Sequence, residues 1–162
     1  MRKNDFHLSG LTRIFTNIFY HLKIKTMAHL NPYLTYGNNC RDAMNFYKDC
    51  LGGELFLQTV GELPAMAAQM PPEMKNNILH STLTSGDITI MASDLNRETP
   101  IEGNTVHLCV NCKKENELNT FFSKLSRGGK ITEPIADMPW GAKYGSLTDK
   151  FGKHWLFNFS KE

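Results

Sequence analysis

The sequence predicts an α+β fold in which one small unit, a βαβββ module, occurs twice in tandem. Three features predict it: segments of alternating apolar and polar residues, two segments with apolar residues at helical spacing, and a Gly-Gly pair directly after each helical segment. Phe46 and Phe121 are 75 residues apart, and Gly52 and Gly128, which open the two Gly-Gly pairs, are 76 apart. Matching helix ends at a matching offset indicate an internal duplication.

The first module starts with an alternating strand at residues 30–36. Asn38 or Asn39 can then cap a helix that Gly52-Gly53 ends, because glycine tolerates the left-handed conformation past a helix end. The apolar stripe of this helix is Ala43, Phe46, Tyr47, Cys50 and Leu51. Three strands follow, at residues 54–60, 79–85 and 87–93.

The second module repeats this order. A strand at residues 105–110 precedes a helix at residues 114–126, which Gly128-Gly129 ends. The helix carries Leu118, Phe121, Phe122 and Leu125 on one side. Its three strands are expected at residues 130–133, 145–149 and 154–159.

Residues 1–26 differ from the rest of the chain, with five basic side chains, one acidic side chain and apolar residues at helical spacing. A basic amphipathic helix of this kind can lie on an anionic membrane surface. We favour the alternative that residues 1–26 are an extension outside the fold. The remainder, 27–162, is then one domain with modules at about residues 30–95 and 103–160.

Composition excludes two classes of function. The net charge is +2, and residues 27–162 carry 13 basic and 15 acidic side chains, so this body has no electrostatic reason to follow a phosphate backbone. We therefore expect no nucleic acid partner. The sequence has no run of the roughly 20 apolar residues that a membrane span needs, which predicts no integral membrane association.

Four cysteines, at positions 40, 50, 109 and 112, include one CxxC pair. Cys109 belongs to an expected strand, where residues three apart start on opposite faces, and no second CxxC follows. This favours two unconnected cysteines over a redox or zinc site. A chain of this length needs no disulfides to stabilise its core, so we expect a cytoplasmic protein.

Three segments resemble a known family: NPYLTYGNNCRDAMNFYKDCLGGEL, ILHSTLTSGDITIMASD and PWGAKYGSLTDKFGKHW. They are similar to the PhnB-like branch of the vicinal oxygen chelate superfamily, which includes glyoxalase I, extradiol dioxygenases and bleomycin-resistance proteins. The resemblance covers residues 30–159. It implies a glyoxalase-like fold, in which curved sheets form a cup, and a homodimer.

The resemblance also implies where a divalent metal would bind, because metal-dependent members take His or Glu ligands from four strands. The matching positions here are Pro32 or Tyr33, Met91 or Ala92, Thr105, and Leu156. None of these is a usual ligand for a divalent metal. We therefore expect no metal and no other cofactor.

Strand alternation predicts what lines the cup instead. If Thr105 faces inward, His107 and Cys109 do so too. The expected lining residues are Tyr33, Thr82, Met91, Ser93, Thr105, Cys109, His154 and Asn158, with Trp140 and Tyr144 at the rim. Mixed apolar walls with a few polar groups suit a small organic ligand.

His80 and His107 are the candidates for chemistry, because histidine is the usual acid or base near neutral pH. The alternative, which we favour for each, is a hydrogen bond within its own sheet. Asp149 and Gly152 predict a tight turn in which the carboxylate accepts turn hydrogen bonds and the glycine takes a positive φ. The long connection at residues 61–77 predicts a lid, a partner contact or disorder, and the spacing of its methionines equally fits a short helix that breaks near Met70.

These features lead to a first hypothesis, a metal-independent homodimer that binds a small, partly apolar molecule. The second is an enzyme of the same superfamily: a lyase, isomerase or dioxygenase that uses non-standard metal ligands, or a histidine as base. The third is a partner-binding protein that uses its sheet edges and the methionine-bearing connection. The sequence leaves open whether the chain catalyses a reaction.

Overall fold

The computed structural model describes residues 28–96 and 98–160, so the hypothesis about residues 1–26 lies outside the described residues. From Asn31 on, the chain forms one compact unit. Within the described ranges, no helix is both long and apolar enough to cross a membrane.

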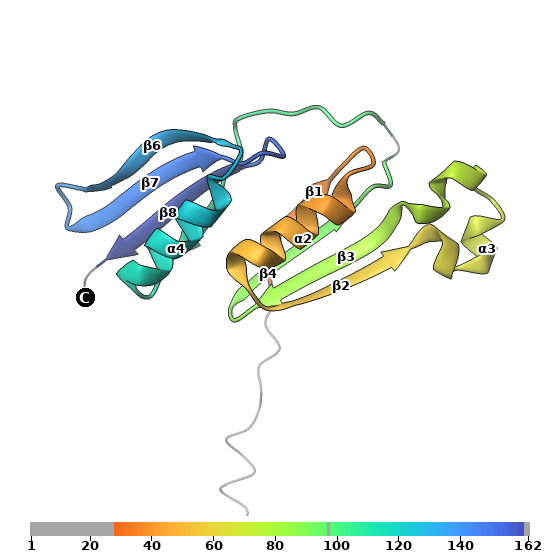
Figure 1. The fold of residues 1–162 in the computed structure, drawn as a ribbon, viewed down its shortest axis with the longest axis horizontal. Helices are drawn as coiled ribbons and strands as arrows, with labels where there is room; N and C mark the ends of the chain where they lie inside the picture. Colours follow the sequence, from red (N-terminus) through yellow and green to blue (C-terminus); the bar gives the residue numbers. More distant parts are fainter. Residues whose placement is uncertain (1–27, 97, 161–162) are drawn as a thin grey trace, which may run out of the picture. The chain divides into compact units, whose positions relative to one another are not determined.

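The first module contains one long helix and a four-stranded sheet (Figure 1). The sheet order is β1-β4-β3-β2, with β1 parallel to β4 and the other neighbours antiparallel. The elements are β1 (Tyr33–Thr35), α2 (Cys40–Leu51), β2 (Glu54–Thr59), β3 (Ile78–Ser85) and β4 (Ile88–Ser93). Three short helices lie between β2 and β3: η1 (Val60–Glu62), α3 (Pro64–Ala67) and η2 (Pro72–Asn76).

The second module has the same order of elements, β5-β8-β7-β6, with β5 parallel to β8. Its elements are β5 (Leu108–Asn111), α4 (Glu115–Leu125), β6 (Lys130–Asp137), β7 (Ala142–Thr148) and β8 (His154–Ser160). The predicted α+β fold of two tandem βαβββ modules is therefore confirmed.

Four strands differ from their predicted bounds by three or more residues. β1 begins at Tyr33 rather than at residue 30, and β7 begins at Ala142 rather than at residue 145. β5 begins at Leu108 rather than at residue 105, because its ladder with β8 begins where Leu108 pairs with Trp155. β6 extends to Asp137, past Pro134, and pairs with the start of β7. A proline is tolerated there because β6 is an edge strand, and the register shifts around it.

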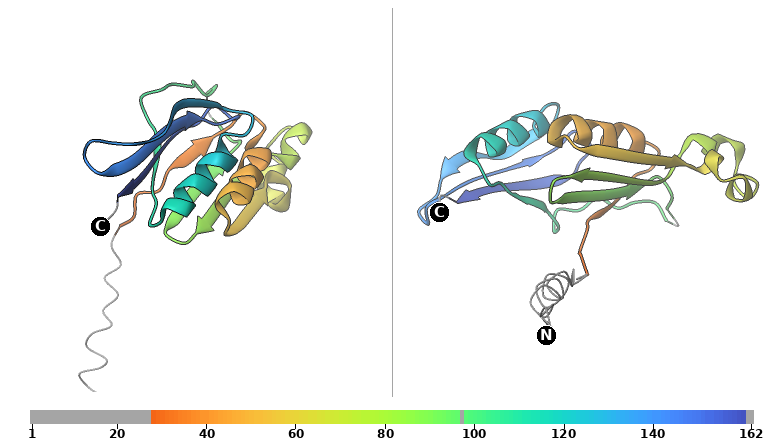
Figure 2. Two further views of the ribbon diagram at one scale, coloured as in Figure 1. Left: turned by 60° about the vertical axis from the view of Figure 1, so that its left-hand side comes forward. Right: turned by 90° about the horizontal axis from the view of Figure 1, so that it is seen from below.

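Both helices cover the same face of their sheets and contact one another (Figure 2). Residues at helical spacing on α2 and α4 are buried: Cys40, Ala43, Met44, Tyr47, Cys50 and Leu51, then Leu118, Phe122 and Leu125. Beneath them lie strand residues of one parity, among them Leu83, Ile90, Leu147, Trp155 and Phe157. The opposite faces are open in this chain, where Tyr33 is 49% exposed and Phe56 is 56% exposed.

The Gly-Gly pairs have a second role that the sequence pattern does not reveal. Gly52 and Gly128 take the positive φ that ends each helix. The next glycines, Gly53 and Gly129, pass so close to a strand that an added Cβ would clash with the carbonyl oxygen of Thr84 and of Thr148, respectively. Both modules therefore use glycine to bring the end of the helix against the sheet.

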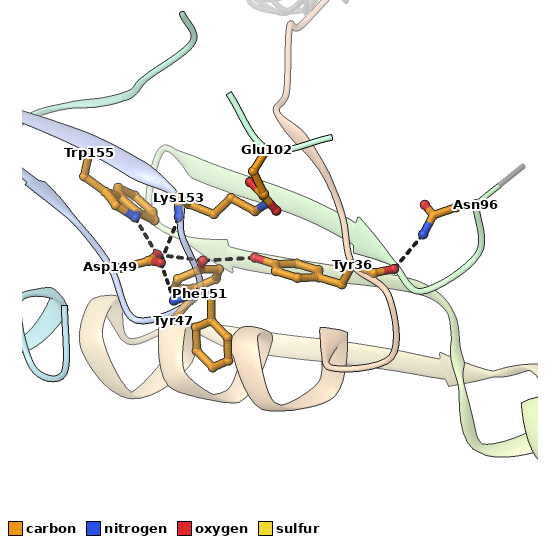
Figure 3. Close-up of polar contacts among 8 residues, drawn as sticks. All are labelled: Tyr36, Tyr47, Asn96, Glu102, Asp149, Phe151, Lys153 and Trp155. Atoms are coloured by element: carbon orange, nitrogen blue, oxygen red, sulfur yellow. Dashed lines mark hydrogen bonds and ion pairs between the residues drawn. The ribbon is translucent and has the colours of Figure 1, made fainter. Parts of the chain in front are cut away.

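The modules are joined by a buried carboxylate at the turn between β7 and β8 (Figure 3). Asp149 is 3% exposed. One of its oxygens accepts a hydrogen bond from the Tyr47 hydroxyl of α2 at 2.7 Å and another from the Trp155 indole of β8 at 2.8 Å. The Tyr36 hydroxyl oxygen lies 2.9 Å from the Tyr47 hydroxyl oxygen. Tyr36 is the donor of this bond, because Tyr47 donates its own proton to Asp149.

Burial raises the pKa of the Tyr36 and Tyr47 phenols well above the usual range, so both stay protonated donors at any physiological pH. The second oxygen of Asp149 accepts the backbone N–H groups of Phe151 at 2.8 Å and Lys153 at 3.0 Å. Gly152 has φ 81°. The predicted turn is confirmed, and the same carboxylate also holds the two modules together.

Replacing Asp149 by Asn should lower the free energy of unfolding by about 2–4 kcal/mol, because an amide nitrogen would face buried donors where a charged acceptor now stands. Tyr47→Phe should cost about 2–4 kcal/mol, since it removes the hydrogen bond to the Asp149 carboxylate and leaves the buried Tyr36 hydroxyl without its acceptor. Urea unfolding followed by circular dichroism measures both changes.

The control is Asp87→Asn, which alters an exposed carboxylate and should leave the free energy of unfolding unchanged. An Asp149→Asn variant as stable as this control would show that the buried carboxylate does not join the modules.

Candidate functional site

A cavity of about 620 Å³ lies between β1, the segment that joins the modules, and the β7–β8 turn. We call it the linker cavity. β1 contributes Tyr33, Leu34 and Thr35 to its wall, the turn contributes Gly152 and Lys153, and β8 contributes His154. Three residues of the predicted pocket, Tyr33, Thr105 and His154, are among those that line it.

The first predicted catalytic residue, His80, lies on the open face of β3 next to Tyr33. The Tyr33 hydroxyl is 3.5 Å from Nδ1 of His80, and the two ring centroids are 5.9 Å apart. Nε2 of His80 is 3.1 Å from the Thr82 hydroxyl. Both imidazole nitrogens therefore have hydroxyl partners rather than a carboxylate that would fix the ring as a general base.

The second predicted catalytic residue, His107, is exposed and lies next to His154, with ring centroids 5.4 Å apart. Nδ1 of His154 is 2.9 Å from the Thr148 hydroxyl, which leaves Nε2 of His154 for another partner. Tyr33 and His154 thus both line the linker cavity, and each contacts one of the two predicted histidines. Among the described residues, no hydrogen bond or ring contact joins His80 directly to His107.

The strand register places a row of four side chains across the open face of the first sheet. Tyr33 pairs with Met91, Met91 with Thr82, and Thr82 with Phe56. The sequence analysis missed Phe56, which is 56% exposed. The alternation in β2 places Phe56 and Gln58 on one face, but it cannot say which face the helix covers.

Ser93, another predicted pocket residue, is buried in this chain. It is 2% exposed. Its hydroxyl donates to the Ile78 carbonyl at 3.2 Å and accepts the Leu95 N–H at 2.8 Å, so it binds backbone groups at the end of β4.

The remaining predicted residues lie on or beside the second sheet. Cys109 is exposed on β5, and Asn158 on β8 donates to the Asn111 side chain at 3.3 Å. Tyr144 pairs with Asn158 across the ladder. Trp140, at the β6–β7 turn, is 71% exposed. Their roles as pocket residues stay predictions.

The CxxC pair is split between two environments. Cys109 is exposed, Cys112 is buried, and both are free thiols. Burial raises the pKa of Cys112 to about 11, so this thiol is protonated near neutral pH and is a poor nucleophile. This arrangement agrees with two unconnected cysteines.

The described residues do not form a cluster of ligands for a divalent metal. Within residues 28–96 and 98–160, no three His, Cys, Asp or Glu side chains converge on one point. Leu156, at one of the four ligand positions that the resemblance implies, lies in the ladder between Cys109 and Ser146. The residues present therefore do not fit the metal site of metal-dependent relatives.

The fold agrees with a family comparison. Residues 28–157 match the model of the Glyoxalase/Bleomycin resistance protein/Dioxygenase superfamily, and the chain belongs to this superfamily. Protein YjdN of Escherichia coli is 28% identical over 141 residues, which cover 82% of this chain and 96% of that protein.

Two solved structures have the same fold over most of this chain. Protein PA1353 of Pseudomonas aeruginosa is 31% identical, with a TM-score of 0.72 over 84% of this chain and all of that one. A Bacillus cereus protein described as a PhnB protein and putative 3-demethylubiquinone-9 3-methyltransferase is 23% identical, with a TM-score of 0.63 over 82% of this chain and all of that one. At that identity, the second likeness shows the fold alone.

Proposed function

We propose that this chain binds a small organic molecule in the linker cavity and on the adjoining open sheet faces, without a metal. The observation that carries the proposal is the cavity itself: about 620 Å³, within the usual range for small-ligand sites, with Tyr33 and His154 on its wall. Tyr33 lies next to the His80 ring, and His154 lies next to the His107 ring and the Thr148 hydroxyl. These imidazole and hydroxyl groups can bind hydrogen-bonding groups on a ligand.

The chemistry of the walls supports a ligand that is partly apolar. Tyr33 and Phe56 present aromatic surface on the open face of the first sheet, and Met91 lies between Tyr33 and Thr82 in the same row. Aromatic rings bind planar apolar groups, while the His80 and Thr82 side chains bind polar edges.

The proposed assembly is a cytoplasmic homodimer. A second copy would cover the open sheet faces, where Tyr33 and Phe56 are about half exposed. Free thiols at all four cysteines are consistent with a reducing compartment. Size-exclusion chromatography with light scattering should give twice the 18.4 kDa chain mass, and a mass of one chain would contradict the dimer.

Purified protein should contain no stoichiometric metal by mass spectrometry, and Zn²⁺, Ni²⁺, Mn²⁺ or Fe²⁺ should not shift its thermal melt. A metal at 100 times its Kd would add about 2.7 kcal/mol of stability, which is about 5–11 °C in a chain of this size. Stoichiometric metal or such a shift with one ion would contradict the proposal. It would instead favour a metal-dependent lyase, isomerase or dioxygenase with non-standard ligands.

A thermal-shift screen of neutral aromatic and hydroxylated compounds should identify a ligand, and His80→Gln should then weaken its binding about tenfold by calorimetry. The loss of one hydrogen bond in a partly buried site accounts for this change. The variant should keep the unfolding midpoint of the parent, since His80 packs on an open face.

His29→Gln is the matched control, because His29 is exposed and precedes β1. Equal affinities for His80→Gln, His29→Gln and the parent would remove His80 from the site.

A further inference from the structure

The segment at residues 98–107, here called the strap, joins the two modules and forms one wall of the linker cavity. It contains no helix and no strand. The strap residues that line the cavity are Glu98, Pro100, Ile101, Glu102, Gly103, Thr105 and Val106. Whatever holds the strap in place therefore controls one side of the cavity.

The strap has little to hold it. Among the described residues, it makes no backbone–backbone hydrogen bond. Its apolar side chains do not anchor it either, since Ile101 is 96% exposed and Val106 is 76% exposed. Segments with few backbone hydrogen bonds and few buried contacts open at low cost in free energy.

One polar contact ties the middle of the strap to the body of the protein (Figure 3). Nζ of Lys153 lies 2.8 Å and 3.0 Å from the two carboxylate oxygens of Glu102. Within the described part of the chain, this is the strap's one side-chain hydrogen bond or ion pair. It joins the strap to the β7–β8 turn, directly next to His154 on the cavity wall.

The two partners of this ion pair differ in how firmly they are held. The Lys153 side chain is 14% exposed, its backbone N–H donates to Asp149, and its Nζ lies 5.0 Å above the Tyr36 ring. The Glu102 side chain is 59% exposed and belongs to the strap. Lys153 is thus held by the body of the protein, and Glu102 can move away from it together with the strap.

We propose that the strap is a gate on the linker cavity, held closed by the Glu102–Lys153 ion pair. This inference rests on the proposed function, since it assigns a way of entry to the same site. Breaking the pair frees the strap while the Asp149 network keeps the modules together. Ligands then reach the Tyr33 and His154 sides of the cavity from the strap side.

A thiol placed on the cavity wall reports opening without any ligand. Thr35→Cys on β1 supplies the thiol, in a Cys109→Ser background that removes the exposed native one. Burial raises the pKa of Cys40 and Cys112 to about 11 and also raises that of Cys50, so these three thiols react slowly. The reagent is iodoacetamide, which is neutral and small.

Adding Glu102→Gln or Lys153→Met to this background should speed labelling of the cavity thiol about threefold, the ratio that a partly exposed ion pair supports. One molar NaCl should also speed labelling of the protein that keeps the Glu102–Lys153 pair, and it should leave the labelling rate of the Glu102→Gln variant unchanged. Two variants that break the ion pair are used because Lys153 packs on Tyr36 and its replacement can affect folding, which melting curves would reveal.

The matched control is Lys113→Met, which breaks the exposed Lys113–Asp87 pair and should not change the labelling rate. The proposal of a gate would be wrong if the protein with the intact Glu102–Lys153 pair and both variants that break it were labelled at equal rates. It would also be wrong if salt did not change the labelling rate of the protein with the intact pair. Because labelling requires no ligand, failure of the ligand screen would remove the proposed function separately, and the labelling rates would still decide whether the strap opens.

Discussion

The arrangement of the two modules depends on one buried carboxylate. Asp149 accepts four hydrogen bonds, two from the backbone of its own turn and two from side chains of α2 and β8. A buried charge is tolerated only when its acceptor sites are used, and here they are used by groups from both modules. The same hydrogen bonds therefore also help to hold Tyr33, in the first module, and His154, in the second, on the wall of the linker cavity.

Local patterns in the sequence predicted most of the fold. The stripes of α2 and α4 and the Gly-Gly pairs are signals within a few residues, and so is the Asp149–Gly152 turn. The start of β5 was wrong, because alternation at residues 105–107 says nothing about whether a partner strand runs alongside. The contact of Asp149 with Tyr47 could not be read from the sequence either, since neither residue carries a local sign of the other.

The site was predicted less completely than the fold, for a similar reason. Strand alternation correctly put His80 and Thr82 on one face of β3 and His154 and Asn158 on one face of β8. Alternation does not report depth, however, so Ser93 was assigned to the pocket although the end of β4 buries it. The strap and its contact to Lys153 carry no sequence pattern at all, because a segment without regular structure has no periodicity.

The Tyr47–Asp149 bond also bears on how the protein is made. Its two partners are 102 residues apart in the chain, and α2 is synthesised long before the turn that completes it. On the ribosome, the first module emerges with the hydroxyl of Tyr47 lacking its final acceptor and with α2 lacking its contact to α4. Contacts at such sequence separation slow folding, since a long loop must close before they form. The contacts that join the two modules can therefore form only after the β7–β8 turn has been synthesised.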